Sequence, residues 1–226
     1  MEPSTRDQMQ RSAVQGAGEM VEVIIPPLGL RGNLSIPPGA RVLIVFVHGS
    51  GSSRHSPRNR AVAEALNRHA MATLLFDLLT EEEEADRANV FDIGPLAERL
   101  IETVGWIDRD PRLQHLPLGL FGASTGAAAA LLAAAELGDR IGAIVSRGGR
   151  PDLAGPALDK VRIPTLLIVG GEDDVVIELN KEAMIRLKGP KTLDIVPRAT
   201  HLFPEPGTLE IVMAHAAQWF EAYLFK

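Results

Sequence analysis

The sequence contains no cysteine, and this absence removes several kinds of chemistry at once. A chain without thiols has no disulfide framework, no thiolate zinc site and no cysteine nucleophile. The composition fits a reducing compartment, and we expect a soluble, cytoplasmic protein.

Basic charge is also scarce. The 226 residues carry 23 Lys and Arg against 29 Asp and Glu, a formal net charge of −6, and no block of basic residues occurs. Because a nucleic-acid-binding surface needs a basic field, the sequence argues against a nucleic-acid partner. The one charge run is acidic, at residues 81–84, and is typical of a solvated helix start or loop.

Long apolar runs and cofactor motifs are missing too. The most apolar stretch, residues 127–135, is too short and too rich in small residues to span a bilayer, so we expect no membrane partner. Residues 1–18 are polar and lack the apolar core of a signal peptide, which predicts a disordered tail before a single domain at residues 19–226. Neither H-E-x-x-H nor a helix-opening G-x-G-x-x-G is present, and we predict no metal and no cofactor.

What the chain does have is an alternation of strand and helix patterns from residue 41 onward. Residues 42–47 form a continuous β-branched run typical of a strand buried on both faces, and residues 93–107 place apolar side chains on one helical face. Further strands are expected at 21–25, 29–36, 72–76, 118–121, 141–145, 165–169 and 192–196, and further helices at 59–70, 124–137, 179–187 and 209–224. This order predicts an α/β fold, a mostly parallel twisted sheet with helices on both faces. The connections between these elements are short and leave room for little or no lid. Any lid must come from residues 78–92 or residues 148–161.

The segment G-A-S-T-G at residues 122–126 lies between an apolar strand and an alanine-rich helix. The G-x-S-x-G pattern is weak alone, but this setting is that of a nucleophile elbow, whose tight turn strains the serine and needs small flanking residues. Ser124 then stands at a helix N-terminus, which favours developing negative charge, and the Thr125 N–H is a candidate oxyanion donor. The alternative is that Ser124 only caps the helix.

A serine nucleophile needs a base and an orienting acid downstream. Of the six histidines, only His201 follows a predicted C-terminal strand and precedes the last helix. The acid comes from the segment after strand 165–169, where Asp173 is preferred to its neighbour Asp174 and Glu172 is third. Turn formation is the alternative role for these acids.

The loop after strand 42–47 reads H-G-S-G-S and is the expected source of the second oxyanion donor. We predict the Ser50 N–H, with Gly51 close behind as a donor or substrate contact. An ordinary flexible loop is the alternative.

Three further residues are candidates for substrate binding. Arg54 and Arg147 follow predicted parallel strands, whose carboxyl ends share one edge of the sheet, and guanidinium groups there suit an anionic or polar acyl group. The alternative is that they pair with nearby acids or face solvent, which we favour for Arg58 and Arg60. Phe203 either walls the pocket beside His201 or packs in the core.

Together these motifs resemble the small, lidless α/β-hydrolases grouped with dienelactone hydrolase, from about residue 21 to the C-terminus. The resemblance rests on H-G-S-G at 48–51, G-A-S-T-G at 122–126, G-E-D-D at 171–174 and A-T-H at 199–201. It is strongest to a subgroup that shares S-R-G-G-R-P-D-L, here at 146–153, and is sometimes joined to a phosphoribosyltransferase-like domain. It implies the fold, a Ser-His-Asp triad and ester chemistry.

One departure limits the resemblance. Dienelactone hydrolases proper use a cysteine nucleophile, which this chain lacks. We therefore predict a carboxylesterase-like serine hydrolase that cleaves small-molecule esters or lactones through an acyl-enzyme. The alternatives are a non-catalytic binding protein with this fold and an acyltransferase that uses the same triad.

Overall fold

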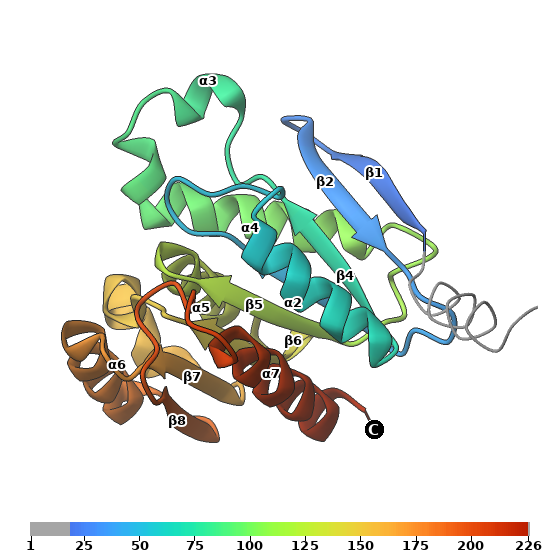
Figure 1. Ribbon diagram of the computed structural model, residues 1–226. Helices are drawn as coiled ribbons and strands as arrows, with labels where there is room; N and C mark the ends of the chain where they lie inside the picture. The colour runs from blue at the N-terminus through green and yellow to red at the C-terminus, as the bar shows by residue number, and fades with distance from the viewer. Residues whose placement is uncertain (1–18, 226) are drawn as a thin grey trace, which may run out of the picture.

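The computed structural model describes residues 19–225, and the tail predicted at residues 1–18 lies outside this range. Eight strands form one twisted sheet in the order β1-β2-β4-β3-β5-β6-β7-β8 (Figure 1). All pairs from β4 to β8 are parallel, and β1 and β2 form an antiparallel extension beside β4. The strands are β1 (Met20–Ile25), β2 (Leu30–Ser35), β3 (Val42–Val47), β4 (Met71–Phe76), β5 (Leu118–Ala123), β6 (Ile141–Arg147), β7 (Thr165–Gly170) and β8 (Lys191–Val196).

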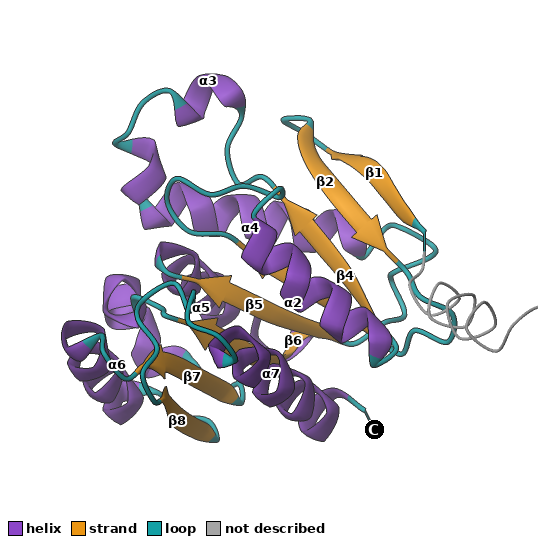
Figure 2. Ribbon diagram, viewed as in Figure 1, coloured by secondary structure: helices purple, strands orange, loops and turns teal. Residues whose placement is uncertain are grey.

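Helices cover both faces of this sheet, as the alternation of patterns predicts (Figure 2). The α-helices are α2 (Pro57–Arg68), α3 (Glu81–Glu84), α4 (Ile93–Ile107), α5 (Thr125–Leu137), α6 (Asp174–Arg186) and α7 (Thr208–Leu224), and the 3-10 segments are η1 (Asn89–Phe91), η2 (Gly138–Arg140) and η3 (Pro151–Lys160). The protein therefore has the predicted α/β-hydrolase architecture. None of the helices in residues 19–225 is long and apolar enough to cross a membrane.

The sheet divides the core into two layers, because successive side chains of a strand point to opposite faces of the sheet. In β3, Ile44 and Phe46 pack with α2 and α7, whereas Val45 and Val47 pack with α4 and α5. All six residues of β3 are buried. A continuous apolar run in the sequence therefore corresponds to a central strand that is covered on both sides.

Two predicted helix starts were wrong. Helix α2 begins at Pro57, not at residue 59, because the Ser56 hydroxyl accepts a hydrogen bond from the Asn59 amide and proline suits the first helical position. Helix α6 begins at Asp174, five residues before its predicted start. Its first turn contains β-branched residues of low helix propensity, but Val176 and Ile177 pack against β7, and this packing outweighs the propensity.

The two segments considered as sources of a lid differ in position. Residues 148–161 contain η3, which packs on α5 and α6 and belongs to the body of the domain. Residues 78–92 contain α3 and η1, and in Figure 1 this segment projects beyond the carboxyl end of β4. The acidic run at Glu81–Glu84 is a short exposed helix that Thr80 caps.

Candidate active site

Ser124 occupies a sharp turn between β5 and α5, with φ 51° and ψ −123°. A residue with a Cβ rarely adopts this conformation, which costs roughly 1–3 kcal/mol and persists only where surrounding contacts enforce it. Backbone hydrogen bonds hold the turn. The Ser124 amide donates to the Arg147 carbonyl at 3.2 Å, and the Ser124 carbonyl accepts from the amides of Arg150 at 3.0 Å and Ala127 at 3.1 Å.

The flanking glycines are required by close approach, as the motif predicts. A Cβ on Gly122 would lie 2.5 Å from the Ala127 Cα. A Cβ on Gly126 would collide with the carbonyl oxygens of Val47 and His48. The start of α5 is therefore pressed against the end of β3, and this contact brings the loop after β3 to the side of Ser124.

His201 and Asp173 reach Ser124 from two other strand ends. His201 lies in the loop between β8 and α7, and Asp173 is the residue before α6. The Asp173 Oδ2 is 2.7 Å from His201 Nδ1, and His201 Nε2 is 3.4 Å from Ser124 Oγ. If Nδ1 donates its proton to the carboxylate, Nε2 is free to accept the serine proton. Asp174, the alternative acid, is exposed in the first turn of α6.

The predicted oxyanion loop also lies beside Ser124. The Ser50 amide donates a hydrogen bond to the Thr125 side-chain oxygen at 2.9 Å, so the two predicted donor residues are in direct contact. Thr125 is the first residue of α5, where amides have no intrahelical carbonyl to bind. In this state the Ser50 amide is engaged by a hydroxyl, and an oxyanion would have to compete for it.

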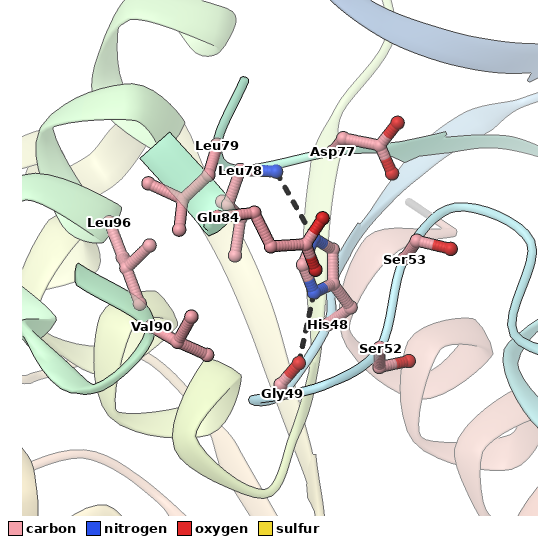
Figure 3. Close-up of a pocket in the computed structure, with 10 residues that line it drawn as sticks. All are labelled: His48, Gly49, Ser52, Ser53, Asp77, Leu78, Leu79, Glu84, Val90 and Leu96. Atoms are coloured by element: carbon pink, nitrogen blue, oxygen red, sulfur yellow. Dashed lines mark hydrogen bonds between the residues drawn. The ribbon is translucent and has the colours of Figure 1, made fainter. Parts of the chain in front are cut away.

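His48, the first residue of this loop after β3, has a positioning role that the sequence reasoning missed. Figure 3 shows its ring between two backbone groups: Nε2 accepts from the Leu78 amide at 3.1 Å, and Nδ1 donates to the Gly49 carbonyl at 3.0 Å. Burial lowers the pKa of His48, although the Gly49 carbonyl and the carboxylates of Asp77 and Glu84 act in the opposite direction. Its only signal in the sequence was its position directly after the apolar run 42–47.

A cavity of about 550 Å³ opens beside the nucleophile. It is lined by Ser124, His201 and the oxyanion loop, including Ser50 and Gly51, and also by Arg58 and Arg147. Arg58, expected to lie in solvent or to pair, is thus one of its walls. No sequence signal distinguished Arg58 from Arg60, because both lie in the first turn of one helix.

Arg147 is the least usual residue of this wall. It is only 6% exposed, and its Nη1 has no hydrogen-bond partner among the described residues. Burial, together with the nearby charge of Arg58, lowers the pKa of Arg147 to about 10. The guanidinium therefore remains charged at neutral pH, and it forms no ion pair with any acid of residues 19–225.

Two predicted substrate contacts do not line the cavity. The Arg54 guanidinium pairs with the Asp77 carboxylate and lies 3.7 Å from Glu22, and Asp77 also accepts from the Arg54 amide at 2.8 Å. Phe203 is 2% exposed and packs within the core on the α7 face, and its neighbour Leu202 contacts the cavity instead. For both residues the structure supports the alternative role given in the sequence analysis: an ion pair for Arg54 and core packing for Phe203.

Within residues 19–225, no group of three or more His, Asp or Glu side chains is arranged to hold a metal ion. The cavity is lined by five serines, two histidines and two arginines, and among these Ser124 and His201 are in hydrogen-bond contact with each other. A hydroxyl next to an oriented imidazole is suited to nucleophilic attack on a carbonyl carbon.

Comparison with solved structures extends the similarity to almost the whole fold. A dienelactone hydrolase from Anabaena variabilis is 53% identical, with a TM-score of 0.89 over 92% of this chain and 99% of that protein. The chain belongs to the dienelactone hydrolase family. It thus has the α/β-hydrolase fold, and Ser124 lies at the turn between β5 and α5.

More distant and longer proteins also match this member of the dienelactone hydrolase family. Est1E from Butyrivibrio proteoclasticus shares the fold, with 18% identity and a TM-score of 0.75 over 91% of this chain and 99% of its own. Two Mycobacterium tuberculosis proteins named as phosphoribosyl transferases are 54% identical over 225 residues, which is 97% of this chain and 51% of theirs. The chain therefore spans about half the length of these curated relatives. No family model matches the sequence.

Proposed function

We propose that the chain is a carboxylesterase-like serine hydrolase of small esters or lactones, with Ser124 as nucleophile, His201 as base and Asp173 as orienting acid. One observation carries the proposal: the side chains form a continuous path, with 2.7 Å from Asp173 to His201 and 3.4 Å from His201 to Ser124. The second distance is long for a hydrogen bond, but such contacts often tighten only when substrate binds.

The reaction follows from this arrangement in two steps. His201 Nε2 takes the hydroxyl proton while Ser124 Oγ bonds to the carbonyl carbon, and the amides of Ser50 and Thr125 stabilise the oxyanion. The ester C–O bond then breaks, the alcohol leaves with the proton held by His201, and the acyl group stays on Ser124. Water, deprotonated by His201, attacks the acyl-enzyme, and the carboxylic acid leaves as Ser124 recovers its proton.

The strain at Ser124 favours an active enzyme over a binding protein that keeps the triad as a relic. A helix-capping serine needs no positive φ, and its side chain here makes no capping hydrogen bond. The phosphoribosyl transferase name belongs to proteins of about twice the matched length. The serine and histidine that line this cavity, with the Asp173 carboxylate bonded to the histidine, support acyl chemistry instead.

A fluorophosphonate probe tests the nucleophile directly. We expect intact-mass and peptide analysis to place one adduct on Ser124 and to find none in Ser124→Ala or in heat-denatured protein. Ser146→Ala is a matched control, because Ser146 is buried on the neighbouring strand β6 and its Oγ has no partner among the described residues. It should label like the wild type.

Turnover of p-nitrophenyl acetate tests the second step. We expect release of acetic acid in stoichiometric amounts with p-nitrophenol, and a loss of at least about 10³-fold in kcat for Ser124→Ala. The hydrolase proposal fails if Ser124 is not labelled and Ser124→Ala retains the wild-type rate. Transfer of the acetyl group to an added alcohol with no acid formed would replace it with the acyltransferase.

A further inference from the structure

Asn180 is a fully buried polar residue on α6 that the proposed mechanism does not use. Its Nδ2 donates to the Gly149 carbonyl at 2.9 Å and to the Val176 carbonyl at 2.8 Å. Because both partners are carbonyls, the side-chain nitrogen must be the atom that faces them. The bond to Val176 stays within the helix, whereas the bond to Gly149 leaves it. Asn180 therefore ties α6 to the segment at residues 147–150.

An asparagine at this position is unfavourable for stability alone. Asparagine has a low helix propensity, and the Oδ1 of Asn180 is buried without a hydrogen-bond partner among the described residues. Leaving a buried polar atom unpaired costs stability. The other buried side chains of α6, Val176, Ile177 and Ala183, are apolar. A polar residue among them indicates a task other than packing.

The segment that Asn180 binds is also bonded to the backbone of the nucleophile. The Arg147 carbonyl accepts the Ser124 amide at 3.2 Å, and the Arg150 amide donates to the Ser124 carbonyl at 3.0 Å. Gly149, the partner of Asn180, lies between these two bonds in the chain. The position of this segment therefore determines where the backbone of Ser124 stands.

The same segment lies against His201. Gly148 has a φ of 51°, and a Cβ on it would lie 2.9 Å from the His201 carbonyl oxygen and 3.6 Å from two atoms of the imidazole ring. The Gly148 amide donates to the Ile168 carbonyl at 2.8 Å, which fixes this backbone on β7. Residues 147–150 thus hold the backbone of the nucleophile and limit the movement of the base on one side.

The helix at the other end of this link carries the acid. Asp173 directly precedes α6, and Asn180 lies about two turns further on, on the same face of the helix. Val176 and Ile177 hold this face on β7 by apolar contact, which is non-directional. A hydrogen bond depends steeply on distance and angle, so the amide of Asn180 fixes the position of the helix along its axis.

We propose that Asn180 is a positioning residue of the triad, whose amide sets the distance between the Asp173 carboxylate on α6 and His201 beside the 147–150 segment. This inference rests on the proposed hydrolase function. Asn180 does not line the active-site cavity and acts only through the residues that it holds. Without its amide, α6 is free to shift along β7, and the 2.7 Å contact between Asp173 and His201 lengthens.

Asn180→Leu removes the donor and keeps a similar side-chain shape. We expect kcat for p-nitrophenyl acetate to fall about 10- to 100-fold and KM to stay within about twofold, because the catalytic geometry is disturbed while the lining of the cavity is not. Asn180→Ala, which removes the same donor without branched bulk, should show the same division between kcat and KM. A wild-type kcat in either folded variant would overturn the proposal.

Asn67→Leu is the matched control. Asn67 is also a buried asparagine on a helix, and its Nδ2 donates to the Met71 carbonyl at 2.9 Å, but it lies on α2 and outside the active-site cavity. This variant should keep kcat within about twofold of the wild type, even where its melting temperature falls. If Asn67→Leu loses as much kcat as Asn180→Leu, the loss reflects general destabilisation and the positioning role is wrong.

A double-mutant cycle measures whether Asn180 acts through the acid. Asp173→Asn has no carboxylate to position, so adding Asn180→Leu to it should change kcat by less than about threefold. Two full losses that multiply would mean that Asn180 acts elsewhere and would contradict the proposal. The proton between His201 Nδ1 and Asp173 provides a second readout, since its downfield NMR signal should shift or broaden in Asn180→Leu and stay unchanged in Asn67→Leu.

The same kinetics separate this inference from the proposed function. If Asp173→Asn and Ser124→Ala keep the wild-type rate, the hydrolase proposal itself fails. If those two variants lose activity and Asn180→Leu does not, only the positioning role of Asn180 fails, and the assignment of the triad stands.

Discussion

The Ser50 amide donates to the Thr125 hydroxyl at 2.9 Å, so the side chain next to the nucleophile occupies one of the two amides proposed to stabilise the oxyanion. Thr125 is 4% exposed, and its hydroxyl accepts the hydrogen bond of the Ser50 N–H. The same hydroxyl must yield this donor when a carbonyl oxygen becomes negatively charged.

Thr125→Val tests this competition. Valine keeps the branched shape but offers no acceptor, so the Ser50 N–H is left free for the oxyanion. Binding of the oxyanion then no longer breaks a hydrogen bond. We expect kcat/KM for p-nitrophenyl acetate to rise by up to about fivefold, which corresponds to about 1 kcal/mol for one hydrogen bond. Thr125→Ser should behave like the wild type. A tenfold loss in Thr125→Val would mean that the hydroxyl anchors the loop and that Gly51 provides the second donor.

Asp173 and Asp174 form a natural pair for testing the orienting acid. Asp173→Asn should reduce kcat by roughly 10²- to 10⁴-fold, because the amide no longer holds His201 in the required tautomer. Asp174→Asn should stay within about twofold, since Asp174 is exposed in the first turn of α6. Steady-state kinetics of the two variants, with circular dichroism as a fold control, provide the measurement. Equal losses would contradict the assignment.

The strain at Ser124 predicts opposite behaviour for two small substitutions. Ser124→Gly should be more stable than Ser124→Ala by about 1 kcal/mol, because glycine accepts a φ of 51° and alanine keeps the Cβ that opposes it. For a chain of this size, that difference corresponds to about 2–4 °C in Tm. Calorimetry of the two inactive variants measures it. If alanine matches or exceeds glycine, the turn is not strained.

The half-buried histidine His48 predicts loss of stability in acid. Because burial lowers the pKa of His48, its neutral form is favoured by folding, and below about pH 6.5 the unfolded chain binds a proton that the folded protein resists. The contribution of neutral His48 to the free energy of unfolding is complete above about pH 6.5 and is lost as the pH falls below that value. Between pH 7.5 and 5.5, we expect the wild type to lose up to about 1.4 kcal/mol more unfolding free energy than His48→Gln.

Urea unfolding at the two pH values provides this measurement. The control is His115→Gln, since His115 is exposed in a loop far from the site and its replacement should leave the wild-type difference in place. If His48→Gln keeps that difference as well, another group causes the acid sensitivity.

Local patterns in the sequence were sufficient for the fold and the elbow. The alternation of apolar runs and helical faces reports which residues must be buried, and burial of this kind specifies a covered parallel sheet. The glycines at 122 and 126 could be interpreted from their spacing around Ser124, although the β3 carbonyls that require the second glycine are distant in the sequence. Helix starts were less certain, as α6 shows, because packing on β7 outweighs propensity.

The tertiary structure decided what each charged side chain does. Arg54 and Arg147 look equivalent in the sequence, both after a parallel strand, yet Arg54 meets Asp77, which lies 23 residues away, and Arg147 meets no acid in the described chain. The Ser50–Thr125 contact joins residues 75 positions apart, and His201 reaches Asp173 rather than Asp174 through the geometry of two loops. Sequence alone determined which residues arrive at the carboxyl edge of the sheet. Which of them pair and which face the substrate depends on distances between separate loops, and only the folded chain sets those distances.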